Sequence, residues 1–212
     1  RDTSPHGIMT LKQVLKKSSN ICAAKIGMSM SPAKFHEYIL RFGFGQRPNS
    51  GVAAEASGRV ISPKKWQTID HANISFGQAI LVSPLQMVSA ANVFANEGQW
   101  VPPYIVEHLR DNNGKKLQEI KDNNGKLIQS FGKGVRSAVV EASVAALVKE
   151  YLVSVTQQGG TAEQAAIKGY QIAGKTGTSQ IYDQQARNNR QETRRHVIAQ
   201  SFCAKSSKFF AA

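Results

Sequence analysis

A lysine and two threonines stand close together on one short segment near the C-terminal end of the chain. Residues 169–173 alternate as in a half-buried β-strand, and Lys175, Thr176 and Thr178 follow directly. Ammonium and hydroxyl groups placed along a strand bind a carboxylate through charge-assisted hydrogen bonds. A strand glycine allows a ligand or another backbone to come close, so Gly177 predicts that a substrate lies along this segment.

A second polar group, Ser18, Ser19 and Asn20, separates two apolar helical patterns over residues 11–17 and 21–26. Side chains at a junction between helices can point into a cleft. A simple turn or helix cap explains the same three residues without any chemistry. The segment therefore becomes a candidate site only if a second motif supports it.

Further elements must position these two polar groups. Two Ser-Pro pairs, at 31–32 and 83–84, are typical of helix starts, and three more helices are predicted at 32–42, 84–98 and 135–155. Apolar residues of the last two helices are expected to face inward; these are Leu85, Val88, Ala91, Ala95, Val144, Leu147, Val148, Tyr151, Leu152 and Val155.

Short strands are predicted between and after these helices. Asp-Asn-Asn-Gly occurs at 111–114 and again at 122–125, which predicts two tight turns in a meander of strands. The recurrence reflects turn chemistry, because the strands between are too short for a stacked repeat. A strand at 196–202 is expected to run antiparallel to the strand that leads to Lys175.

Composition limits the class of protein. The 212 residues are 41% hydrophobic and 19% charged, which fits a globular chain with one substantial core. No apolar run is long enough to span a membrane, and the N-terminus lacks the apolar core of a signal peptide. Because the chain begins with Arg1 instead of Met, we expect a piece of a longer polypeptide whose membrane anchor lies elsewhere.

The charge is strongly positive, with 27 Lys and Arg against 14 Asp and Glu, and this would attract polyanions. The charges are scattered and no nucleic-acid motif is present, so we do not expect a nucleic-acid partner. Cys22 and Cys203 form no metal-binding pattern. Whether these two cysteines form a disulfide stays open, although the sequence favours unpaired cysteines in the core. We expect no metal and no cofactor.

The two polar groups, taken in order, resemble the second and third signatures of penicillin-binding proteins, Ser-x-Asn and Lys-Thr-Gly. Stretches between them resemble, in the same order, the transpeptidase domain of class B penicillin-binding proteins; they are Arg41-Phe42-Gly43-Phe44-Gly45, Glu55-Ala56-Ser57-Gly58, Ser75-Phe76-Gly77-Gln78-Ala79, Ser83-Pro84-Leu85-Gln86-Met87 and Gly159-Gly160-Thr161-Ala162. The likeness runs from about residue 7 to residue 201. β-Lactamases share the short signatures but not the Ser-Phe-Gly and Ser-Pro-Leu-Gln stretches.

The resemblance implies an α/β (α+β) fold of the penicillin-binding protein and serine β-lactamase type, with an antiparallel sheet packed on helices and incomplete at both ends. It implies a partial transpeptidase domain over residues 1–202 and a divergent tail over 203–212. The activity implied is that of a D,D-transpeptidase that cross-links peptidoglycan, of septal or elongation type. The implied partners are the peptidoglycan stem peptide, β-lactam antibiotics and other cell-wall synthesis or divisome proteins, on the extracytoplasmic face of the inner membrane.

Roles for single residues follow from the same resemblance. Lys175, with the hydroxyls of Thr176 and Thr178, would bind the terminal carboxylate of the substrate or of a β-lactam. The backbone N–H of Thr178 would contribute to the oxyanion hole. Ser18 would relay a proton at the leaving group, and Asn20 would hold the substrate amide.

One signature of the family has no match in its usual place. The nucleophile's Ser-x-x-Lys lies ahead of Ser-x-Asn in this family, and nothing before Ser18 fits it. Residues 31–34 and 62–65 match the pattern, but they lie downstream and carry proline after serine, so we interpret both as helix starts. The chain alone is therefore expected to be inactive. Its end, residues 203–210, does not resemble the family, which is consistent with truncation or a shifted reading frame.

Two other function classes stay open on the sequence alone. The first is a non-catalytic penicillin-sensing or partner-binding module, which reactivity towards a labelled β-lactam would distinguish from an enzyme. The second is a basic polyanion-binding domain, which would bind nucleic acid with a steep salt dependence.

Overall fold

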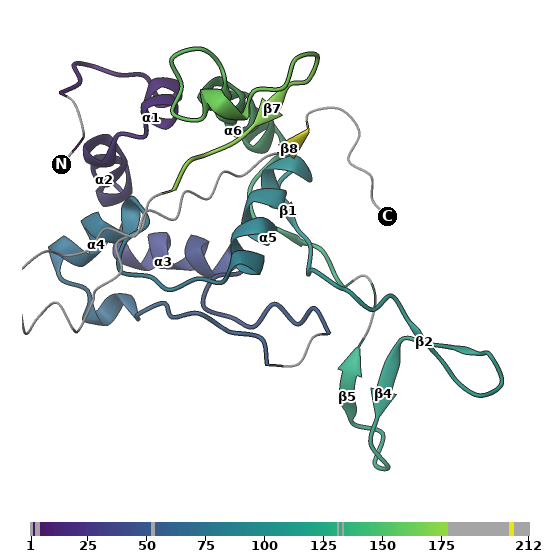
Figure 1. The fold of residues 1–212 in the computed structure, drawn as a ribbon. Coiled ribbons are helices and arrows are strands. Elements are labelled where there is room, and N and C mark those ends of the chain that lie inside the picture. Colours follow the sequence, from purple (N-terminus) through teal and green to yellow (C-terminus); the bar gives the residue numbers. More distant parts are fainter. Residues whose placement is uncertain are drawn as a thin grey trace, which may run out of the picture. The chain divides into compact units, whose positions relative to one another are not determined.

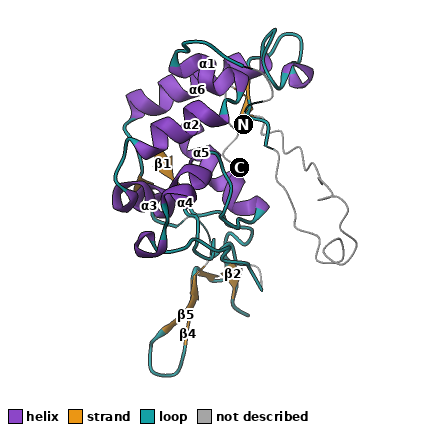
Figure 2. Ribbon diagram, turned by 90° about the vertical axis from the view of Figure 1, so that its left-hand side faces the viewer, coloured by secondary structure: helices purple, strands orange, loops and turns teal. Residues whose placement is uncertain are grey.

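The computed structural model describes residue 2 and residues 5–51, 54–130, 132, 134–177 and 204–205 (Figure 1). In this part of the chain, helices make up most of the regular structure and the strands are short (Figure 2). The helices are α1 (Leu11–Lys17), α2 (Asn20–Met28), α3 (Pro32–Arg41), α4 (Thr68–Ser75), α5 (Pro84–Ala95) and α6 (Ala142–Thr156), with 3₁₀ turns η1 (Pro63–Lys65) and η2 (Glu163–Ala165). None of these helices has the length and apolar character needed to cross a bilayer.

The chain forms two compact units. Unit 1 is built from Arg1–Ser31, Trp66–Ala79 and Leu147–Ala212, and unit 2 from Pro32–Lys65 and Ile80–Ala146. Each unit therefore takes segments from distant parts of the sequence.

In unit 1, helix α1 begins at Leu11, as the helical pattern over residues 11–17 predicted, and a capping box at Thr10 closes its first turn. The backbone N–H of Gln13 donates to Thr10 Oγ1, and the Gln13 amide accepts from the Thr10 N–H at 2.8 Å. Helices α2 and α4 pack closely at Gly27, where an added Cβ would lie 1.9 Å from Ser75 Oγ. Any larger residue at Gly27 would push these helices apart.

A short strand, β7 (Ile172–Ala173), leads to Lys175 and is buried along its whole length. It pairs antiparallel with β8 (Ala204–Lys205). The last turn of α6 holds it in place, because Thr156 Oγ1 donates to the Ile172 carbonyl at 2.6 Å. The strand predicted before Lys175 is thus confirmed, whereas its predicted partner at 196–202 lies outside the described residues.

In unit 2, α5 begins at the predicted Ser-Pro pair and carries the amide that organises the surrounding loops. Gln86 is 2% exposed, and its Nε2 donates to the carbonyls of Gln46 at 2.8 Å and Ser57 at 2.9 Å. Its Oε1 accepts from the Ser83 N–H at 2.8 Å. A single buried side chain therefore joins two glycine-rich loops to the start of α5.

The strands of unit 2 are β1 (Gln99–Trp100), β2 (Leu109–Arg110), β3 (Lys116–Leu117), β4 (Glu119–Lys121), β5 (Leu127–Ser130) and β6 (Ser137–Ala138). They pair as β1–β6, β2–β3 and β4–β5, all antiparallel, so the described strands of this unit form small two-stranded sheets. Both Asp-Asn-Asn-Gly turns are confirmed. In each turn the aspartate Oδ1 accepts two backbone N–H groups at 2.9 Å and the glycine has φ near +80°.

Two predictions about helices are wrong. The helix expected over 135–155 begins only at Ala142, because Ser137–Ala138 pairs with β1 and the Val139 N–H donates to the Gly98 carbonyl at 2.9 Å. The inward faces are also shifted: Val88, Val144 and Leu147 are 44–52% exposed, and α5 buries Gln86, Ser89, Ala90 and Val93 instead. Small and polar residues can form a contact face where backbones come close, and hydrophobic periodicity does not detect such a face.

Candidate active site

The structure brings Ser18 and Lys175 into direct contact, although 157 positions separate them. Lys175 Nζ donates to Ser18 Oγ at 2.6 Å and to the Thr176 carbonyl at 3.0 Å. Both residues lie in unit 1. The two polar motifs recognised in the sequence thus meet at one place.

The end of helix α1 positions Ser18. It is the C-cap residue, with φ 55° and ψ 44°, and its backbone N–H donates to the Leu15 carbonyl at 3.2 Å. This left-handed conformation is unfavourable for a residue other than glycine, at a cost of roughly 1–2 kcal/mol. It turns the chain sharply between α1 and α2 and leaves the Ser18 hydroxyl beside Lys175.

The segment after Ser18 is held by a carboxylate that sequence reasoning missed. Asp2 Oδ2 accepts from Ser19 Oγ at 2.6 Å, and Asp2 Oδ1 accepts from the N–H groups of Asn20 at 2.7 Å and Ile21 at 3.1 Å. Burial raises the pKa of Asp2, but these hydrogen bonds, with His6 nearby, outweigh it and the net pKa is lowered. No local spacing could have revealed this contact, because Asp2 is 17 positions before Ser19.

Lys175 is presented by the residues that follow β7. The Gly174 N–H donates to the Leu152 carbonyl of α6 at 3.2 Å, which fixes the backbone just before the lysine. Burial lowers the pKa of Lys175. Both hydrogen bonds of its ammonium go to neutral oxygens, and no acidic side chain in the described ranges pairs with it. Among the described residues, one of its three N–H donors has no partner and can bind an incoming acceptor.

The loop between α6 and β7 forms a third side of the site. Thr176 Oγ1 donates to Thr161 Oγ1 at 3.0 Å, and the Thr161 N–H donates to the Lys16 carbonyl at 3.3 Å. The neighbouring Lys17 ammonium donates to the Gly159 carbonyl at 2.9 Å. Thr161 was not predicted as a site residue, although the Gly-Gly-Thr-Ala stretch that contains it was one of the signals for the family.

The remaining candidates are placed less directly. Asn20 is half-buried at the first position of α2, and Gly177 is exposed two residues after Lys175. Thr178 lies outside the described residues, as does Cys203, and Cys22 is a half-buried free thiol. No cluster of potential metal ligands is present in the described ranges.

The Ser-x-x-Lys sequences at 31–34 and 62–65 are confirmed as helix starts. Pro32 opens α3, where Lys34 pairs with Glu37 at 3.1 Å, and Pro63 opens η1.

Comparison with known proteins points to one family. The family model for the penicillin binding protein transpeptidase domain matches residues 1–210. The chain is 34% identical over 188 residues to penicillin-binding protein PbpB of Mycolicibacterium smegmatis, covering 85% of this chain and 27% of that protein. It is 30% identical over 179 residues to the peptidoglycan D,D-transpeptidase FtsI of Escherichia coli K12, covering 84% and 27%. The chain therefore spans about a quarter of the length of these relatives.

Solved structures show the same likeness. Apo penicillin-binding protein 3 of Mycobacterium tuberculosis superposes with a TM-score of 0.75 at 29% identity, over 87% of this chain and 40% of that one. The apo transpeptidase domain of Burkholderia pseudomallei penicillin-binding protein 3 gives a TM-score of 0.70 at 31% identity, over 86% and 49%. From the family match and these relatives, the chain belongs to the penicillin-binding protein transpeptidase domain family, in its class B branch, with the α+β fold of that family.

Proposed function

We propose that this chain forms part of a peptidoglycan D,D-transpeptidase and supplies two of the three groups of residues that the acyl transfer requires. The observation that carries the proposal is the 2.6 Å contact between Lys175 Nζ and Ser18 Oγ. It joins the Lys-Thr-Gly and Ser-x-Asn motifs, and no carboxylate of the described residues already occupies the ammonium.

Lys175 and Thr176 bind the carboxylate of the terminal D-alanine, or that of a β-lactam. The partly buried ammonium has a free N–H, and Coulomb attraction is stronger away from bulk water. Thr178 adds its hydroxyl to this carboxylate site and its backbone N–H to the oxyanion hole, while Gly177 keeps the approach along this segment open.

Ser18 carries a proton between the reacting groups. Because the Lys175 ammonium can only donate, Ser18 Oγ accepts from it and keeps its own O–H for another partner. That hydroxyl delivers a proton to the leaving D-alanine amine when the peptide C–N bond breaks and the acyl–serine bond forms. Asn20 holds the substrate amide from the start of α2.

The acyl-accepting serine comes from a Ser-x-x-Lys sequence encoded ahead of Arg1. The proposed partners are the peptidoglycan stem peptide, β-lactams and other proteins of cell-wall synthesis or division, at the extracytoplasmic face of the inner membrane. In support, structures of the Mycobacterium tuberculosis relative are complexes with aztreonam and ampicillin.

The proposal is tested by incubating two polypeptides with a fluorescent penicillin and measuring the adduct by intact-protein mass spectrometry. This chain alone is expected to form no stoichiometric adduct. The polypeptide extended by the sequence encoded ahead of Arg1 is expected to form one adduct, on a serine of that extension. An adduct on Ser31 or Ser62, or an extension without Ser-x-x-Lys, would contradict the proposal.

A non-catalytic penicillin-sensing or partner-binding module is the second candidate, and the same experiment separates it from an enzyme. In that case the extended polypeptide would bind the labelled penicillin without forming a covalent adduct, or would not bind it at all.

A further inference from the structure

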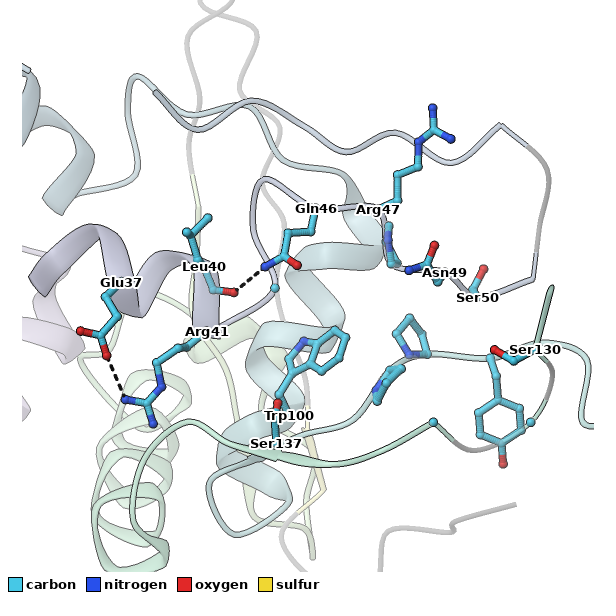
Figure 3. Close-up of a pocket in the computed structure, with 17 residues that line it drawn as sticks. Glu37, Leu40, Arg41, Gln46, Arg47, Asn49, Ser50, Trp100, Ser130 and Ser137 are labelled. Atoms are coloured by element: carbon cyan, nitrogen blue, oxygen red, sulfur yellow. Dashed lines mark hydrogen bonds and ion pairs between the residues drawn. The ribbon is translucent and has the colours of Figure 1, made fainter. Parts of the chain in front are cut away.

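Unit 2 contains a cavity of about 630 Å³ that includes none of the residues of the candidate active site (Figure 3). Its volume is within the range of about 300–1,000 Å³ that is usual for ligand sites. One wall is the loop of residues 46–50 and the other is the segment of residues 100–104. Both walls belong to unit 2, so the cavity is formed within one compact unit.

The cavity is preformed by contacts that hold both walls. The Glu55 carboxylate accepts from the N–H groups of Asn49 and Ser50, each at 2.7 Å, and also from the Ser50 hydroxyl. The Ile105 N–H donates to the Ser50 carbonyl at 3.0 Å, which joins the two walls. Pro102 and its neighbours stiffen the second wall, so little conformational entropy is lost when a ligand binds.

The aromatic ring of Trp100 lines the cavity. The indole N–H of Trp100 is buried without a hydrogen-bond partner among the described residues, and it lies against Gly43, where an added Cβ would be 2.6 Å from Nε1. Figure 3 shows the ring between the two walls, below Gln46. Tyr104 is a second aromatic side chain in the lining. Aromatic rings present broad apolar surface with little rotamer freedom to lose.

Around the rings, the polar groups that a ligand can reach are neutral. The side chains of Asn49 and Tyr104 form no hydrogen bond to another described residue, and Gln46 uses only its Nε2, which donates to the Leu40 carbonyl at 3.1 Å. They therefore offer an amide, a hydroxyl and an amide oxygen. These groups can both donate and accept hydrogen bonds.

The charged lining residues are already satisfied or directed elsewhere. Arg41 pairs with Glu37 at 3.6 Å and donates to the Ala138 carbonyl at 2.9 Å. The Arg47 side chain points away from Trp100 (Figure 3). Among the described lining residues, no unpaired cation therefore points towards Trp100 to attract a strongly anionic ligand. A purely apolar ligand would leave the amides and the hydroxyl without hydrogen-bond partners, which is unfavourable.

We propose that this cavity binds an uncharged sugar chain. A pyranose ring has an apolar C–H face that can stack on Trp100 or Tyr104, and hydroxyl edges that can pair with neutral amides and hydroxyls. The inference rests on the lining of unit 2 and does not depend on the chemistry of Ser18 and Lys175.

The chain has only two tryptophans, Trp66 and Trp100, so Trp66→Phe leaves Trp100 as the single reporter. The Trp66→Phe protein is titrated with the trimer of N-acetylglucosamine and, separately, with maltotriose, while the emission is recorded. Saturable change with at least one sugar is expected. An acidic peptide of similar size serves as the comparison ligand and is expected to cause no saturable change.

Two variants locate the binding by isothermal titration calorimetry. Trp100→Ala removes the stacking surface. Asn49→Gly removes the amide but suits the left-handed backbone at this position, where φ is 57°, so the fold is kept. Each is expected to weaken sugar binding by about tenfold or more, as truncation of a central contact commonly does. Lack of saturation with both sugars, unchanged affinity in Asn49→Gly, or preference for the acidic peptide would overturn the proposal.

Discussion

At the scale of single residues, the site depends on two residues, Ser18 and Lys175, that are held in energetically unfavourable states. Ser18 adopts a left-handed backbone conformation, and Lys175 keeps an ammonium partly buried with neutral partners. Each state is disfavoured on its own and is maintained by surrounding contacts, a pattern typical of functional sites.

The strain at Ser18 predicts an unusual order of stabilities. Ser18→Ala and Ser18→Gly both lose the hydrogen bond to Lys175, but glycine adopts a φ of +55° freely. Ser18→Gly is therefore expected to be more stable than Ser18→Ala by about 1 kcal/mol, measured by urea denaturation. Ser29, a C-cap with φ −74°, is the matched control, and there the alanine variant should be at least as stable as the glycine variant. The same order at both positions would contradict strain at Ser18.

The burial of Lys175 predicts a pH dependence with a defined sign. Its folded pKa lies below the ordinary value of 10.5, so between these two values the unfolded chain binds more protons. The penalty for burying the charge is fully present below the folded pKa and is relieved as pH rises towards 10.5. Lys175→Met removes this penalty. Its stability relative to wild type should therefore fall as pH rises through the folded pKa of Lys175 towards 10.5. Exposed Lys168→Met is the control, and a pH-independent difference for Lys175→Met would contradict the expectation.

At the scale of elements, helix starts and loop junctions depend on single polar side chains from elsewhere in the chain. Asp2 satisfies the first N–H groups of α2 and the hydroxyl of its N-cap, Ser19. In unit 2, the Gln86 amide donates hydrogen bonds to backbone carbonyls of two loops. Unpaired backbone groups are costly when buried, which is why one side chain can decide the position of a whole segment.

Removing the carboxylate should loosen α2. Asp2→Ala is expected to lower the free energy of unfolding by about 1 kcal/mol at neutral pH, as for loss of a helix cap. Because the folded pKa of Asp2 is lowered, its contribution is present above the unfolded pKa, near 3.8, and is lost as pH falls through the folded value. Urea denaturation at a series of acidic pH values measures this. A difference between wild type and Asp2→Ala that does not shrink in acid would contradict the role of the charge.

Substitution of Gln86 is expected to lower the free energy of unfolding more than substitution of its exposed neighbour Met87. Gln86→Leu keeps the volume but leaves buried carbonyls and the Ser83 N–H without partners, and the free energy of unfolding should fall by at least about 2 kcal/mol. Met87→Leu, at a position that is 37% exposed, should change it by less than about 0.5 kcal/mol. Equal effects in thermal or chemical denaturation would show that the amide hydrogen bonds do not hold the loops.

At the scale of the whole chain, local features were predictable and long-range contacts were not. The capping box at Thr10, the Ser-Pro start of α5 and the Asp-Asn-Asn-Gly turns depend on neighbours within a few positions. The helix expected from residue 135 was wrong because Ser137–Ala138 pairs with a strand almost 40 positions earlier. Pairing over such a distance can override a local helical pattern.

For the candidate site too, local motifs were predictable and long-range contacts were not. Its residues could be named only because Ser18–Asn20 and Lys175–Thr176 resemble a known family in order. Their contact across 157 positions has no local signal. Asp2 and Thr161, which hold the two motifs, were missed because each acts through a partner that is distant in sequence.

The central claim is that Lys175 anchors the carboxylate of the substrate or of a β-lactam. It is tested by the rate of acylation by a fluorescent penicillin in the polypeptide extended ahead of Arg1, for wild type and for Lys175→Ala. Loss of a hydrogen bond to a charged group costs about 1.5–3 kcal/mol, so Lys175→Ala should be slower by about one to two decades. Lys168→Ala removes an exposed charge from the same stretch and should acylate like wild type. A Lys175→Ala protein that acylates as fast as wild type would contradict the account.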